Sequence, residues 1–191
     1  SGASAKTQVH WIHGYNAPGT PNSLNMVGSL RFGPSHAPNI LILNPGTSAG
    51  SAYFAPLARA IVNRTPGWQV WSVERRENLL EDHSLIDRAK AKKATAKQLS
   101  DYYVGWLDDS TITPHIQLIP NDQVTFAKAW GMNVEIQDLR RVVTRAAKLG
   151  GKVVVGGHSL GGSITSAYAT WDFNGTPGAK GLSGLVFIDG G

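Results

Sequence analysis

The sequence predicts an α/β fold in which a mostly parallel β-sheet is flanked by helices. Strand-like apolar runs alternate with helical patterns along much of the chain, and this alternation is typical of parallel sheets with right-handed crossovers. In the expected strand at residues 39–43, Asn39 is followed by the uninterrupted apolar run Ile40-Leu41-Ile42-Leu43, as expected for a strand that is covered on both faces. Hydrophobic side chains make up 41% of the 191 residues, which is enough for one sizeable buried core.

Five elements are expected before residue 74, each from its own pattern. Short apolar runs predict strands, and apolar residues spaced three and four apart predict a helix. Stretches rich in Pro, Gly and Asn separate these runs and predict turns. The expected strands cover residues 9–12, 26–32, 39–43 and 69–73. The expected helix covers residues 54–62.

A long segment then interrupts the alternation. It covers about residues 74–130 and contains a helical region at about residues 85–107 and a connection with two prolines. We therefore interpret residues 1–191 as the amino-terminal part of a single domain with a long insertion. The alternation resumes in the last third of the chain. A helix is expected at residues 133–149, a strand at 152–156, a helix at 160–170 and a strand at 184–188.

Composition excludes several classes of protein. The chain has no cysteine, which excludes disulfides, thiol catalysis and thiolate metal sites. Neither a cofactor nor a metal is expected, because no cluster of side chains has metal-ligand spacing. The formal net charge is +5, but acidic residues are interleaved with the basic ones, so nucleic acid is not an expected partner. No apolar run approaches about 20 residues, so stable membrane insertion is not expected. A secreted or periplasmic location is favoured over a cytoplasmic one.

The motif Gly157-His158-Ser159-Leu160-Gly161 has the pattern G-x-S-x-G and lies between an expected strand and an expected helix. A serine on such a sharp turn projects clear of the sheet. Side chains at the two flanking glycines would collide with the neighbouring strand and helix. The amino terminus of the following helix offers N–H groups to a developing oxyanion. The alternative is a glycine-rich loop in a Rossmann-like sheet, although the spacing is not a clean G-x-G-x-x-G.

With this motif, the whole chain resembles the α/β-hydrolase family, and the resemblance implies an α/β-hydrolase-type sheet. It also implies that Ser159 is the nucleophile and that the N–H of Leu160 lines an oxyanion hole. The second oxyanion donor in that family follows the third strand. Here that loop is Asn44-Pro45-Gly46-Thr47, which points to Thr47 as the donor, with Gly46 and Ser48 as neighbouring alternatives.

A serine nucleophile also needs a general base, and the family places its histidine after the last strand. No histidine follows Ser159 in this sequence. Asp189 ends the last expected strand and is a possible triad acid, because open α/β sheets place their sites at the carboxyl ends of strands. We therefore expect that the carboxyl-terminal strands of the fold are missing from this chain. A second polypeptide or carboxyl-terminal fragment is expected to complete the fold and supply the base.

These observations predict a serine hydrolase that acts on a small-molecule carboxylic ester through a covalent acyl-enzyme, as esterases and lipases do. Two alternatives stay open at this point. The absent histidine favours a non-catalytic, hydrolase-like module that binds a ligand. An amide or peptide hydrolase or an acyltransferase would use the same constellation of residues.

Overall fold

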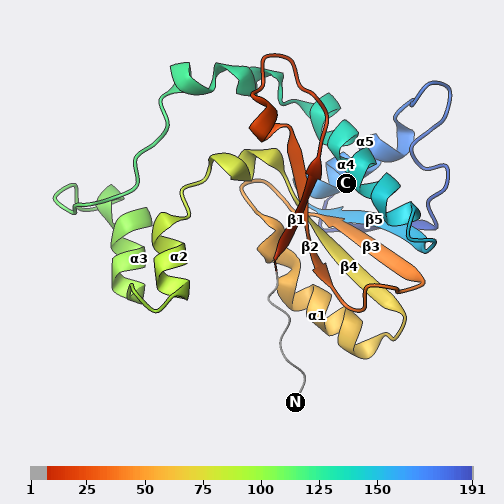
Figure 1. Cartoon of the computed structure of the whole chain (residues 1–191), viewed down its shortest axis with the longest axis horizontal. Helices are drawn as coiled ribbons and strands as arrows, with labels where there is room; N and C mark the ends of the chain where they lie inside the picture. Colours follow the sequence, from red (N-terminus) through yellow and green to blue (C-terminus); the bar gives the residue numbers. More distant parts are fainter. Residues whose placement is uncertain (1–7, 191) are drawn as a thin grey trace. The chain divides into compact units, whose positions relative to one another are not determined.

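The structure, a computed structural model, describes residues 8–190 and divides into two compact units. Of the described residues, 8–79 and 126–190 form the larger unit, and Leu80–Thr125 form the smaller unit. The larger unit contains the sheet (Figure 1). The residues of both hydrophobic core clusters also belong to this unit. The described residues contain no helix with the length and apolar character that crossing a bilayer requires.

Six strands of the larger unit form one mixed sheet in the order β1-β2-β4-β3-β5-β6. β2 pairs antiparallel with both β1 and β4, whereas β4, β3, β5 and β6 are parallel to one another. The strands are β1 (Val9–His13), β2 (Met26–Phe32), β3 (Asn39–Asn44), β4 (Trp68–Glu74), β5 (Lys152–His158) and β6 (Gly184–Ile188). The expected mostly parallel sheet is therefore confirmed, with an antiparallel β2.

Helices cover both faces of this sheet, as expected (Figure 1). Helix α1 (Ala55–Arg64) packs on one face, and helices α4 (Met132–Ala147) and α5 (Leu160–Thr170) pack on the other. The central strand β3 shows why its sequence is apolar without interruption. Ile40 and Ile42 contact the core beneath α4 and α5, whereas Leu41 and Leu43 contact the core beneath α1.

The smaller unit contains two helices where the sequence predicted one helical region at about residues 85–107. They are α2 (Ser84–Lys90) and α3 (Ala96–Tyr103). Lys92 adopts a positive φ of 57°, which ends the first helical path. Thr95 and Gln98 then form a capping box that starts α3. The expected helical region is therefore present as two helices, and the break was not predicted because neither signal changes the apolar spacing.

Short 3₁₀ helices occupy several of the connections between these elements. They are η1 (Asn22–Leu24), η2 (Ser51–Phe54), η3 (Arg76–Leu80), η4 (Gly105–Leu107) and η5 (Asn121–Ala129).

Candidate active site

A sharp turn between β5 and α5 positions Ser159. The strand ends at His158 and the helix begins at Leu160, so Ser159 alone joins them. Its backbone angles, φ 51° and ψ −122°, are ones that residues with a side chain rarely adopt. Such a conformation costs about 1–3 kcal/mol and persists only where the surrounding structure enforces it. The Ser159 side chain is exposed. The turn therefore presents this hydroxyl to solvent at the carboxyl edge of the parallel strands.

Close packing between β3 and α5 enforces this turn. A Cβ atom at Gly161 would lie 2.0 Å from the backbone oxygen of Asn44, and one at Gly157 would lie 2.3 Å from the backbone of Gly161. Only glycine fits at either position without a shift of the backbone. The side chain of Asn44 also donates a hydrogen bond of 3.1 Å to the backbone oxygen of Gly156. The end of β3 is thus joined to both sides of the turn.

The loop that follows β3 lies against the same turn. A Cβ atom at Gly46 would be 3.2 Å from the Cβ of Ser159 and 3.1 Å from Nδ1 of His158. Thr47, the next residue, is exposed. Leu160 is the first residue of α5, where backbone N–H groups have no partner within the helix. The structure therefore brings Ser159, Leu160 and the loop that contains Thr47 to one place.

Asp189 also lies at this edge of the sheet, because β6 is the parallel neighbour of β5. Its backbone oxygen accepts a hydrogen bond of 3.3 Å from the backbone N–H of Ser159. The residue has a positive φ of 46°, and its side chain is exposed. The structure thus places the Asp189 backbone beside the turn. A role for its carboxylate as the triad acid remains a prediction.

The histidines of the larger unit do not form a pair with Ser159. His158 stacks on Tyr53 with ring centroids 5.1 Å apart, and its buried Nδ1 atom has no hydrogen-bond partner among residues 8–190. His10 and His13 belong to β1, which is separated from β5 by three strands. His36 lies between β2 and β3. Across the described part of the chain, the Ser159 hydroxyl makes no hydrogen bond to an imidazole.

The side chain of a buried arginine, Arg75, is hydrogen-bonded to the loop after β3. Arg75 follows β4 and is 8% exposed. Its guanidinium donates hydrogen bonds of 2.7 Å to the backbone oxygen of Pro45 and 2.8 Å to that of Gly46. Two parallel donors from one rigid planar group fix both the position and the orientation of the two peptide planes. Arg75 therefore determines how this loop lies against Ser159.

Two carboxyl groups share the interior with Arg75. Burial, together with the charge of Glu77 and a hydrogen bond to it, raises the pKa of Glu135 to about 9, although Arg75 acts in the opposite direction. A pKa of about 9 keeps Glu135 protonated at neutral pH. Beside them, Asp138 accepts two hydrogen bonds from Arg76, of 2.8 Å and 2.7 Å. Burial raises the pKa of Asp138 in spite of this partner.

This charged network is the part of the site that we did not anticipate from the sequence. Four consecutive charged residues, Glu74-Arg75-Arg76-Glu77, stand at the carboxyl end of the largely buried strand β4, which ends at Glu74. Charges placed at the carboxyl end of a buried strand are a signal of a functional edge. Their partners, Glu135 and Asp138, are about 60 residues away in the sequence, as the 62-residue separation of Arg76 and Asp138 shows. The sequence gives no indication of which charges meet.

No group of three or more His, Asp or Glu side chains suited to a metal ion occurs among residues 8–190.

No protein-family model matches the chain, and no curated protein matches its sequence. Solved structures do match. A protein described as a "putative lipase" from Sulfolobus solfataricus superposes with a TM-score of 0.60 at 14% identity, and the match covers 96% of this chain and 44% of that one.

Two further structures match with lower TM-scores. A thermostable carboxyl esterase from Bacillus coagulans has a TM-score of 0.48 at 15% identity, with 96% of this chain and 44% of that chain covered. A siderophore hydrolase from Aspergillus fumigatus has a TM-score of 0.38 at 18% identity, with 85% and 38% covered. The chain thus spans less than half the length of these proteins. The strand order, the crossovers and the superposition on the Sulfolobus protein show that this chain has the α/β-hydrolase fold.

Proposed function

We propose that this chain carries the nucleophile of a serine hydrolase that acts on carboxylic esters. The observation that supports this most directly is the backbone of Ser159, held by close packing in a strained conformation with its hydroxyl exposed. Strain of this kind is typical of functional sites, where the surrounding structure must enforce it. The Sulfolobus protein of the same fold is described as a "putative lipase", which agrees with the proposal.

In the proposed reaction, Oγ of Ser159 attacks the ester carbonyl carbon while a base histidine accepts the hydroxyl proton. The carbonyl oxygen becomes an oxyanion, which the backbone N–H groups of Leu160 and Thr47 stabilise by hydrogen bonds. The bond to the leaving alcohol then breaks as the histidine returns the proton to the alcohol oxygen. Water, activated by the same histidine, hydrolyses the acyl-enzyme and releases the acid.

We further propose that a segment outside residues 1–191 supplies the base histidine and completes the sheet beside β6. Two observations support this. The Ser159 hydroxyl has no histidine partner among residues 8–190. The strand β6 exposes Leu185, Val186 and Phe187, the last by 48%, as expected for a strand whose neighbour is another polypeptide segment. Asp189 is the proposed acid that orients the histidine.

Hydrolysis of short p-nitrophenyl esters tests the proposal in the intact protein. The Ser159→Ala variant is expected to lose all measurable turnover, because no other group can form the acyl-enzyme. The matched control is Ser163→Ala, which removes an exposed hydroxyl one turn further along α5. Ester turnover that persists in the Ser159→Ala variant would contradict the proposal. An intact wild-type protein that turns over no ester would favour the non-catalytic binding module instead.

A further inference from the structure

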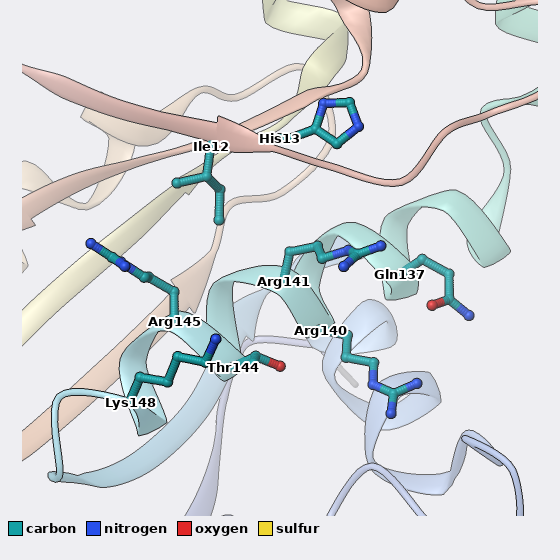
Figure 2. Close-up of a pocket in the computed structure, with 8 residues that line it drawn as sticks. All are labelled: Ile12, His13, Gln137, Arg140, Arg141, Thr144, Arg145 and Lys148. Atoms are coloured by element: carbon teal, nitrogen blue, oxygen red, sulfur yellow. The ribbon is translucent and has the colours of Figure 1, made fainter.

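A cavity of about 540 Å³ lies in the larger unit, lined by residues of β1 and α4 (Figure 2). Its volume is in the range of sites that bind small molecules. The lining includes four permanent cations and no carboxylate. The lining residues are Ile12, His13, Gln137, Arg140, Arg141, Thr144, Arg145 and Lys148.

Helical periodicity brings these cations together. Arg141, Arg145 and Lys148 are spaced four and three residues apart, so they follow one side of α4 and its carboxyl end. Figure 2 shows them along the helix, facing the strand that bears Ile12 and His13. Both Arg141 and Arg145 are exposed, while Val142 and Ala146, which directly follow them, are buried against the sheet. The chain thus forms a cationic row that its linear sequence, with interleaved charges, does not reveal.

The cations of this row form no ion pair with the carboxylates of residues 8–190. A fifth cation, Arg31 on β2, lies nearby with its guanidinium 3.7 Å from the centre of the Trp71 ring. Burial, and then the positive charge of Arg145, lower the pKa of Arg31. Like charges held this close oppose folding unless an anion neutralises them.

The cavity is distinct from the turn at Ser159. It lies at the β1 edge of the sheet, and β1 is four positions from β5 in the strand order. At the usual spacing of neighbouring strands, this separation is about 19 Å. Helix α4 forms the wall of the cavity opposite β1, and the buried side of this helix carries the core residues Val142 and Ala146. A ligand in the cavity would therefore not contact the Ser159 hydroxyl.

We propose that this cavity binds a ligand with clustered phosphate groups. The guanidinium group of arginine donates paired hydrogen bonds to the oxygens of a carboxylate or a phosphate. A phosphate group carries more negative charge and more acceptor oxygens than a carboxylate, so it neutralises several neighbouring cations better. From Arg141 to Lys148 the helix rises by about 10 Å, which exceeds the reach of one phosphate. The ligand therefore carries at least two phosphates. They belong either to one free polyphosphorylated molecule or to neighbouring lipid headgroups.

Calorimetry with inositol hexakisphosphate and inorganic tripolyphosphate tests whether the ligand is a free polyphosphorylated molecule. The wild-type protein is expected to bind at least one of them saturably. The double variant R141Q/R145Q is expected to weaken binding by about tenfold or more, because two charge-assisted contacts are lost. The matched control is R59Q/R64Q, which removes two exposed charges from α1 on the opposite face of the sheet and is expected to bind as the wild type does. Lys148→Gln, just beyond α4, is a second variant that changes no residue of the helix and is expected to weaken binding in the same direction.

Vesicle sedimentation tests whether the phosphates belong to neighbouring lipid headgroups. If headgroups are the ligand, the wild type sediments with vesicles of phosphatidylcholine and phosphatidic acid but not with phosphatidylcholine alone, and R141Q/R145Q loses this binding. Binding to either probe that depends on Arg141 and Arg145 supports the proposal and identifies the source. The proposal is overturned if neither probe binds, or if R59Q/R64Q weakens binding as much as R141Q/R145Q does.

Discussion

The turn at Ser159 requires that residue 161 has no Cβ atom. A methyl group there would lie 2.0 Å from the Asn44 backbone oxygen, which belongs to the central strand and cannot move freely. We expect Gly161→Ala to lower the free energy of unfolding by about 3 kcal/mol, the upper part of the range for overpacked sites. Urea denaturation of the intact protein measures this loss.

The control for that substitution is Gly131→Ala at the start of α4, where nothing lies within 4 Å of the added Cβ. We expect this variant to unfold within about 0.5 kcal/mol of the wild type, as surface substitutions usually do. Equal unfolding midpoints for Gly161→Ala and the wild type would show that β3 and α5 do not pack as described.

Glu135 gives the protein a pH-dependent stability of defined sign. Its pKa is about 9 in the folded protein, because of burial and Glu77, and near 4.5 when unfolded. Between these values the folded state binds more protons than the unfolded state, so stability falls as pH rises. One proton of difference corresponds to at most about 1.4 kcal/mol per pH unit. We therefore expect the urea midpoint to fall between pH 5.5 and pH 8.5, and Glu135→Gln to flatten this fall.

Glu81→Gln is the control for that measurement, because Glu81 is an exposed carboxylate of the smaller unit. It is expected to leave the pH dependence of the midpoint unchanged. If Glu135→Gln showed the same slope as the wild type, the carboxyl group would not be protonated in the folded protein.

Residues differ in how far the sequence predicts their place. The pattern around Ser159 predicts a turn because strand, serine, glycines and helix are neighbours in the chain. The proximity of Glu135 to Glu77 depends instead on the contact between α4 and the segment after β4, where Arg76 meets Asp138, and no local pattern encodes that contact. For Asp189, the sequence predicts one of these two properties and not the other. Its position after β6 was predictable, whereas its role depends on groups beyond the described residues.

Strands and helices were largely predictable because each has its own period of apolar side chains. All six expected strands are present, and the expected helix at residues 160–170 coincides with α5 (Leu160–Thr170). The loops were less predictable. The break between α2 and α3 depends on the backbone of Lys92 and the cap at Thr95, which are set by single residues rather than by periodicity.

The loop after β3 depends on Arg75, which we regard as a positioning residue because it contacts the backbone of Pro45 and Gly46 and not the substrate. We expect Arg75→Lys to keep the buried charge but to lose the paired contact. A displaced oxyanion donor then lowers kcat of ester hydrolysis by about ten- to a hundredfold. Steady-state kinetics should show this fall with KM nearly unchanged.

A merely structural role for Arg75 would instead reduce the amount of folded protein, with kcat per labelled active site unchanged. An Arg75→Lys enzyme with wild-type kcat would contradict the assignment. Arg59→Lys, on the exposed side of α1, is the control and should leave kcat unaltered.

At the scale of the whole chain, its 191 residues span less than half the length of the Sulfolobus protein whose fold they share. If a further segment supplies the base, intact-mass measurement of the unfolded protein, purified from its source in active form, should show more than the 20.4 kDa of these residues. The excess would be either a longer chain or a second polypeptide, and it should contain a histidine. An active preparation that consists only of a 20.4 kDa species would contradict the proposed origin of the base.

The central claim, that Ser159 is an activated nucleophile, is tested most directly by fluorophosphonate labelling of the intact protein. Mass mapping of the tryptic peptide 153–180, which contains Ser159 together with Ser163 and Ser166, locates the adduct. We expect stoichiometric modification of Ser159 alone, lost when the protein is unfolded before labelling, because activation depends on the folded turn. A folded protein in which Ser159 stays unmodified would contradict the claim.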